Sequence, residues 1–202
     1  MPHPRVFAFH KPRGVVVSRV RQGAAPALFE LLLPPHCNWF AVGRLDQDSE
    51  GLILLCDDSR VAQHLMDPGA VAKTYLVTVE GLPTEDALDR LRAGGLPLGT
   101  RLTRPLGVER LGKAPRGGTR LEMVLHEGIS RQIRRSFNLV GHRVRRLVRV
   151  AVGPVRLADL APGTGRELAP EEVAALLAAA GADLSARNRR VAPSMRQDPR
   201  GR

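Results

Sequence analysis

Hydrophobic and polar positions along the chain predict several short strands with helices between them. Strands are expected where apolar residues alternate with polar ones or form a run of strand length, over residues 5–12, 51–56, 74–79, 106–110, 119–125 and 146–152. The segments 51–56 and 74–79 are expected to be neighbouring core strands. A hairpin is expected between 106–110 and 119–125, because a glycine-rich connection separates these two runs.

Three helices are expected where apolar residues recur three and four positions apart, over about 84–93, 130–140 and 170–180. Thr84 and Ser130 are the expected N-caps of the first two helices, and Pro170 suits the first turn of the third. Strands and helices are interspersed without the regular alternation of parallel α/β units. The pattern therefore predicts an α+β fold, with a largely antiparallel mixed sheet flanked by helices.

The chain carries 31 Lys and Arg residues against 20 Asp and Glu, a formal net charge of +11. A positive field favours polyanions, and RNA is the expected partner; a merely solubilising charge is the alternative. One compact domain is expected over residues 1–184, since the chain is too short for two ordinary domains and a linker. Residues 185–202 are basic and nearly lack core-forming side chains, so a disordered tail is expected, either solvated or bound to RNA.

Cysteine content and motif searches exclude several classes of protein. Cys37 and Cys56 are expected to be buried small apolar residues, because two cysteines make no disulfide framework and no zinc-ligand spacing is present. No glycine-rich nucleotide fingerprint occurs. The N-terminus lacks a signal-peptide pattern and the apolar runs are too short to cross a bilayer. A cytoplasmic protein without a membrane partner is therefore expected.

An acidic turn precedes the expected strand at 51–56. Four polar residues stand together there, Asp46, Asp48, Ser49 and Glu50, after the triplet Gly43-Arg44-Leu45. Composition alone favours a helix cap, a turn or a calcium-like loop for these residues over catalysis. The calcium interpretation is weak because the expected spacing of oxygen ligands is absent.

The stretch from Gly43 to Leu55 resembles the signature of the RsuA-type pseudouridine synthases. Other stretches match that family in the same order: Lys11 to Gly14, Lys73 to Tyr75 followed by Val79 to Gly81, Glu127 to Arg135, Gly141 to Gly153, and Gly163 to Glu172. The resemblance extends to about residue 180 and implies the family's fold with a central RNA-binding cleft. Ser136 and the run Cys56-Asp57-Asp58-Ser59 depart from the usual pattern and bear on substrate contacts.

Members of this family often carry a small N-terminal S4 RNA-binding domain, and this sequence starts directly at the catalytic region. That arrangement is most similar to the RluE subgroup, which modifies large-subunit ribosomal RNA. The resemblance thus implies isomerisation of a specific uridine to pseudouridine, and that RNA is the expected substrate. It implies neither a metal nor an organic cofactor.

The resemblance also assigns catalytic roles to three residues. Asp46 would be the essential carboxylate, acting either as a nucleophile at the sugar or as a base on a ribose proton. Arg134 would pair with Asp46 and orient it, and an RNA-phosphate arginine is the alternative. Tyr75 would stack on the target uracil, and an ordinary core tyrosine is the alternative.

Six further residues are expected to bind RNA. Ile133 would pack near the flipped base. The others would contact the RNA backbone, which positions RNA without reading its sequence: Lys11, Arg13, Arg44, Arg131 and Arg135. A monomer without an obligate protein partner is expected.

Two competing functions stay open at this point. A non-catalytic factor that binds or assembles ribosomal RNA would have the same charge, although the joint presence of Asp46, Tyr75 and Arg134 argues against it. A hydrolase using the acidic turn is less favoured, because glycosidases normally need two apposed carboxylates and no second one is identified.

Overall fold

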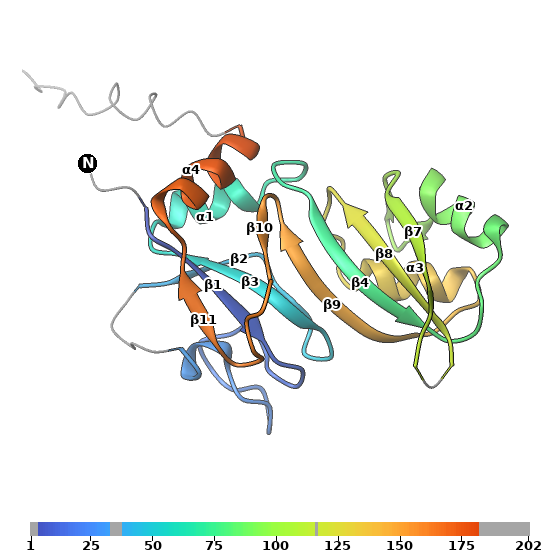
Figure 1. The fold of residues 1–202 in the computed structure, drawn as a ribbon, viewed down its shortest axis with the longest axis horizontal. Helices are drawn as coiled ribbons and strands as arrows, with labels where there is room; N and C mark the ends of the chain where they lie inside the picture. Colours follow the sequence, from blue (N-terminus) through green and yellow to red (C-terminus); the bar gives the residue numbers. More distant parts are fainter. Residues whose placement is uncertain (1–3, 33–37, 116, 182–202) are drawn as a thin grey trace, which may run out of the picture.

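The computed structural model describes residues 4–32, 38–115 and 117–181. Its main element is a nine-stranded mixed sheet with the strand order β11-β1-β3-β9-β4-β8-β7, in which β2 pairs with β3 and β10 with β9 (Figure 1). The strands of this sheet are β1 (Val6–Lys11), β2 (Phe40–Val42), β3 (Glu50–Cys56), β4 (Lys73–Val79), β7 (Gly107–Lys113), β8 (Thr119–Leu125), β9 (Val144–Val152), β10 (Val155–Arg156) and β11 (Gly165–Glu167). Two further strands form a separate pair, β5 (Pro97–Leu98) and β6 (Arg101–Leu102).

Helices cover the two halves of the sheet separately. They are the short 3-10 helix η1 (Leu28–Glu30), α1 (Ser59–Met66), α2 (Glu85–Ala93), α3 (Gln132–Leu139) and α4 (Pro170–Ala179). In Figure 1, α1 and α4 lie over the half that contains β1 and β3, whereas α2 and α3 lie with β4, β7 and β8. No helix in the described ranges has the length and apolar character needed to span a membrane.

The N-terminal half of the sheet is buried on both faces. Along β1 and β3, alternate residues such as Val6 and Leu54 join a core with α1 and α4. The intervening residues, including Phe9 and Ile53, join a second core with the segment that follows β1. Burial on both faces explains why 51–56 is continuously apolar rather than alternating.

The C-terminal half buries one set of side chains against α2 and α3. Val77 and Val79 of β4 pack with Leu88 and Leu91 of α2 and with Phe137 of α3. The side chain of Thr84 accepts a hydrogen bond from the backbone N–H of Ala87 and caps α2 as expected.

The two halves meet through a short parallel contact between β3 and β9. Only Glu50 with Val148 and Gly51 with Arg149 are paired there. The pairing places four residues in one row across the sheet, namely Lys11, Gly51, Arg149 and Tyr75 on β1, β3, β9 and β4. Residues from distant parts of the sequence therefore converge at the start of β3.

The predicted α+β fold with a largely antiparallel mixed sheet is confirmed, as are the helices at α2 and α4 and the hairpin of β7 and β8. One topological prediction is wrong: β3 and β4 are not neighbours, because β9 lies between them. The reason is that β9 comes late in the chain. The pattern of apolar and polar residues along β3 and β4 carries no information about a distant strand that inserts between them.

One local prediction about a helix is wrong, and one helix was not predicted. Ser130 does not cap α3, since the N-cap is Arg131 in a left-handed conformation with φ 52° and without a side-chain cap. The helix α1 was not anticipated, although the side chain of Asp58 accepts hydrogen bonds from the backbone N–H groups of Arg60 and Val61 at its start. Cys56 is buried as expected, whereas Cys37 and the tail at 185–202 lie outside the described residues.

Candidate active site

Asp46 lies in the loop that joins β2 to β3. The backbone carbonyl of Asp46 accepts a hydrogen bond from the N–H of Ser49 at 3.0 Å, which closes a turn directly before β3. A second link joins this loop to the loop after β1, where the N–H of Gly14 donates to the carbonyl of Gln47 at 2.8 Å. The side chain of Asp46 retains 32% exposure. A partly open carboxylate is thus held on a rigid support.

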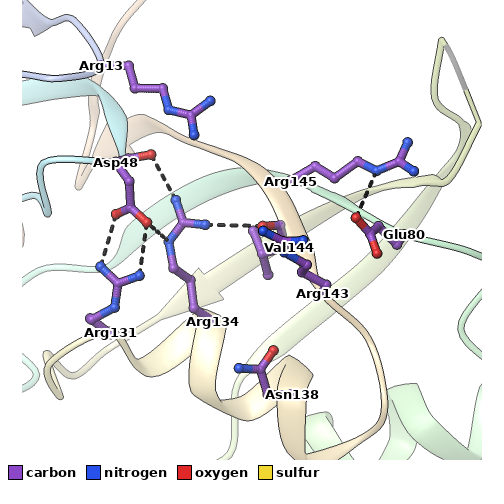
Figure 2. A pocket seen from close by; sticks show the side chains of 9 residues that line it. All are labelled: Arg13, Asp48, Glu80, Arg131, Arg134, Asn138, Arg143, Val144 and Arg145. Atoms are coloured by element: carbon purple, nitrogen blue, oxygen red, sulfur yellow. Dashed lines mark hydrogen bonds and ion pairs between the residues drawn. The ribbon is translucent and has the colours of Figure 1, made fainter.

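Two arginines from the start of α3 reach this loop and converge on Asp48 (Figure 2). Arg131 donates two hydrogen bonds to the Asp48 carboxylate, at 3.0 and 2.9 Å, and the Nε of Arg134 lies 3.2 Å from the same carboxylate. Arg131 also lies 3.7 Å from an Asp46 oxygen. The hydrogen bond from Arg131, with help from the charges of both arginines, lowers the pKa of Asp48.

Arg134 differs from the expectation that it would pair with Asp46. Besides the Asp48 carboxylate, it donates to the backbone carbonyls of Asp48 at 2.9 Å and of Val144 at 3.2 Å. Its side chain is only 11% exposed. Arg134 therefore joins the Asp46 loop to β9. Because the backbone carbonyls of Asp48 and Val144 hold its guanidinium in place, its carboxylate partner is Asp48 rather than Asp46.

The charge of Arg134 is only partly compensated. Burial lowers the pKa of Arg134, and the positive charges of Arg131 and Arg13 act in the same direction, while Asp48 and Asp46 oppose the shift. An additional anion near these three guanidinium groups would relieve their mutual repulsion.

Lys11 was expected to contact the RNA backbone, and the structure does not support that contact. The side chain is 0% exposed, and its Nζ donates to the backbone carbonyls of Pro12 at 3.0 Å and Val15 at 2.7 Å. Burial lowers the pKa of Lys11 to about 8, although the charges of Asp46, Asp48 and Glu50 oppose the shift. Lys11 is thus a buried cation beneath the Asp46 loop.

This shift predicts a pH-dependent stability. Between pH 8 and 10.5 the unfolded chain still binds the Lys11 proton that the folded protein has lost, so the free energy of unfolding rises with pH across this window. Relative to Lys11→Met, the wild type should gain about 2 kcal/mol between pH 8 and pH 10. Urea unfolding of both proteins measures this gain, and a difference that stays constant with pH would contradict it.

Tyr75 lies on β4 opposite Arg149 of β9. Its side chain is half-buried and packs against the core of the C-terminal half. Arg149 is buried, and its Nε donates to the backbone carbonyl of Leu52 at 2.7 Å, which ties β9 to β3 where their pairing ends. The sheet row thus brings Tyr75 to the junction where the Asp46 loop ends and β3 starts.

A hollow of about 390 Å³ opens beside these groups, between the loop after β1, α3 and the start of β9 (Figure 2). Five arginines supply most of its wall, together with Asp48, Glu80, Asn138 and Val144: Arg13, Arg131, Arg134, Arg143 and Arg145. A concave surface dominated by guanidinium groups is suited to phosphate. Among the described residues, no group of three or more His, Cys, Asp or Glu side chains is arranged to hold a metal ion.

The other residues expected to contact RNA differ in their position and exposure. Arg13 and Arg131 line the hollow, Arg44 is exposed beside Asp46, and Arg135 is half-buried. Ile133 is 4% exposed and packs in the core with Val77 and Phe137. As placed, Ile133 offers little surface to a base.

The family model for RNA pseudouridylate synthases matches residues 5–139. This range includes Asp46, Asp48, Tyr75, Arg131 and Arg134. The chain belongs to the RNA pseudouridylate synthase family. The family and the enzyme class predicted from the sequence, an isomerase, are thereby confirmed.

Two relatives in this synthase family are named as ribosomal pseudouridine synthases. The chain is 41% identical to the ribosomal large subunit pseudouridine synthase E of Xanthomonas axonopodis pv. citri (strain 306), over 76% of this chain and 88% of that protein. It is 35% identical to the ribosomal small subunit pseudouridine synthase A of Escherichia coli (strain K12), over 86% of this chain and 74% of that protein. It spans 60% of the length of an uncharacterized RNA pseudouridine synthase of Aquifex aeolicus (strain VF5).

A solved structure of a pseudouridylate synthase shares the fold. It superposes with a TM-score of 0.77 at 28% identity and covers 87% of this chain and 75% of that chain. The predicted pseudouridine synthase fold is therefore confirmed.

Several residues of the candidate site were not singled out by sequence reasoning. Asp48 was noted only as part of the acidic turn. Its position two residues after Asp46, in the same loop, was the available signal. Arg149, Arg143 and Arg145 were not identified because basic residues are frequent throughout the chain. The available signal for the last two was their spacing of two where the chain enters β9, since alternate residues of an extended chain share a face.

Proposed function

We propose that this protein converts a specific uridine in ribosomal RNA to pseudouridine, with Asp46 as the catalytic carboxylate. The reaction breaks the bond between ribose C1′ and uracil N1, turns the base and forms a bond from C1′ to C5. The C5 proton is lost and N1 gains a proton, so no net redox change or hydrolysis occurs. The observation that carries the proposal is the partly open Asp46 carboxylate, held on a rigid loop beside an arginine-lined hollow in a member of this family.

Asp46 has two chemically reasonable roles, attack on the sugar as a nucleophile and removal of a ribose proton as a base. Both require a fixed carboxylate at the glycosidic bond. The guanidinium of Arg131 lies 3.7 Å from this carboxylate, and the buried ammonium of Lys11 interacts with it electrostatically. These positive charges lie close to the carboxylate, which nevertheless stays partly exposed.

Tyr75 and the arginines would divide the remaining work. The target uridine must leave its stack before its sugar can approach Asp46. Tyr75 is the chain's only tyrosine and lies on the row that reaches the Asp46 loop, so its ring can stack on the displaced uracil. Arg13, Arg44, Arg131 and Arg134 would hold backbone phosphates and keep the strand in register.

Asp48 has a positioning role in this account, because it holds Arg131 and Arg134 at the Asp46 loop. Replacement by alanine would leave both guanidinium groups without their shared carboxylate. The variant Asp48→Ala should lower kcat by about 10²-fold while the Kd for RNA changes little. Single-turnover and RNA-binding measurements separate the two effects. The matched control is Asp159→Ala, at an exposed aspartate in the turn after β10, and equal kcat for the two variants would contradict the positioning role.

Large-subunit ribosomal RNA is the proposed substrate, because the synthase E relative has the higher identity of the two ribosomal enzymes compared above. We further propose that the protein acts in the cytoplasm as a monomer without an obligate protein partner. A non-catalytic RNA-binding factor is the competing function, since the basic surface would serve it equally well.

The purified protein can decide between these functions. It would be incubated separately with unmodified large-subunit and small-subunit ribosomal RNA transcripts, and pseudouridines would be mapped by chemical labelling and sequencing. We expect one new site in the large-subunit transcript. A site in the small-subunit transcript alone would keep the activity and correct the substrate, whereas RNA binding without product in either transcript would favour the binding factor.

A further inference from the structure

The arginine-lined hollow contains more positive charge than its own carboxylates compensate. Its wall carries five arginines against Asp48 and Glu80. Asp48 is shared by Arg131 and Arg134, and Glu80 lies 3.3 Å from Arg145. Within the ranges that the structure describes, no ion pair to a carboxylate is recorded for Arg13 or Arg143. Both side chains are exposed and present a net positive surface to the hollow.

The other lining groups narrow the chemistry of a ligand. Asn138 adds an amide that can donate a hydrogen bond, and Val144 adds an apolar side chain. Among the residues that the structure describes, no aromatic ring lines the hollow, so these residues offer a base no stacking surface there. A phosphate group, by contrast, accepts bidentate hydrogen bonds from guanidinium groups.

The position of the hollow relates it to the candidate active site. Arg131 contacts Asp46 and also lines the hollow, and Figure 2 shows Arg13 and Arg143 approaching Arg134 from different sides. A phosphate bound among these groups would lie close to a nucleotide whose sugar reaches Asp46. The hollow is thus placed to hold the backbone on one side of the target.

We propose that Arg143, with Arg13 and Asn138, forms a subsite for a backbone phosphodiester of the RNA strand whose uridine is held at Asp46. This proposal rests on the proposed function, because that function identifies the bound strand as the substrate RNA. Its residues come from the last turn of α3, the linker between α3 and β9, and the loop after β1. The subsite adds Arg143 and Asn138 to the residues expected to bind RNA. The bound phosphate would also supply the anion that the charges around Arg134 lack.

Salt-dependent RNA binding tests this subsite. The probe is a fluorescent oligouridylate of about ten nucleotides, within the usual site size of a single-strand groove. Relative to wild type, Arg143→Ala should raise the Kd about fivefold near 0.1 M salt and reduce the slope of log K against log salt by about 0.7, the value for one lost phosphate contact. The matched control is Arg90→Ala on the exposed side of α2, and it should leave both quantities unchanged. Thermal unfolding confirms that both variants are folded.

Three outcomes would overturn the subsite. Equal slopes for Arg143→Ala and wild type would show that no phosphate is held there, and equal losses for Arg143→Ala and Arg90→Ala would show only a general effect of charge. Stabilisation by inorganic phosphate that Arg143→Ala abolishes, without any change in RNA affinity, would instead assign the hollow to free phosphate. Product formation is measured separately on ribosomal RNA transcripts. If the protein makes pseudouridine but Arg143→Ala does not change the salt dependence of RNA binding, the subsite alone is contradicted. If Arg143→Ala reduces the slope but the wild-type protein makes no pseudouridine, the proposed function alone is contradicted.

Discussion

Replacing Asp46 by asparagine is expected to abolish pseudouridine formation, with a loss of at least about 10⁴-fold in the single-turnover rate. The amide has nearly the same shape as the carboxylate but can neither attack C1′ nor accept a ribose proton. Because Asp46 contributes a negative charge rather than a phosphate contact, the Kd for RNA should stay the same or fall slightly. The rate is measured under single-turnover conditions with the identified ribosomal RNA transcript.

The control for this variant is Asp159→Asn, which makes the same chemical change at an exposed turn outside the candidate site. It should retain the wild-type rate. Turnover by Asp46→Asn at the wild-type rate would remove Asp46 from its catalytic role, even if the protein proved to be an active synthase.

The second large effect is expected from Gly51→Ala, which should lower the free energy of unfolding by about 3–5 kcal/mol. Gly51 has φ 110°, and a Cβ built there would lie 2.3 Å from the backbone carbonyl oxygen of Arg149. That contact is the parallel pairing of β3 with β9, which joins the two halves of the sheet. A side chain would separate the strands at the point where the Asp46 loop ends.

The matched control is Gly112→Ala in β7. Gly112 has φ 126°, but nothing lies within 4 Å of a Cβ built there. Only the backbone cost of about 1–2 kcal/mol should therefore appear. Urea unfolding gives both values, and equal destabilisation by the two substitutions would mean that the close approach of β3 and β9 is not required for stability.

Local sequence patterns predicted the elements of this fold more reliably than their arrangement. The periodicity around Leu88 and Leu91, with Thr84 before them, was sufficient to place α2, because helix spacing and capping are properties of a short segment. The insertion of β9 between β3 and β4 had no such local signal. Strand order depends on contacts between residues about one hundred positions apart, such as Gly51 and Arg149.

The candidate site shows the same division. Resemblance to a family identified Asp46, Tyr75 and Arg134, and the structure brings all three to the junction of the two halves. The resemblance could not predict that Arg134 contacts Asp48 rather than Asp46, because this choice depends on backbone carbonyls of the Asp46 loop and of β9 that hold the guanidinium. Nor could it predict that Lys11, after a strand and before a basic loop, points into the protein. The charge of a side chain indicates its chemistry but not its burial.

Deletion of the gene in its host, followed by a map of pseudouridines across ribosomal and transfer RNA, tests the central claim most directly. The strain would be complemented in parallel with the wild type and with Asp46→Asn. The account predicts that one pseudouridine in large-subunit ribosomal RNA disappears on deletion and returns only with the wild type. An unchanged map in cells that normally express the protein, or restoration of the site by Asp46→Asn, would contradict it.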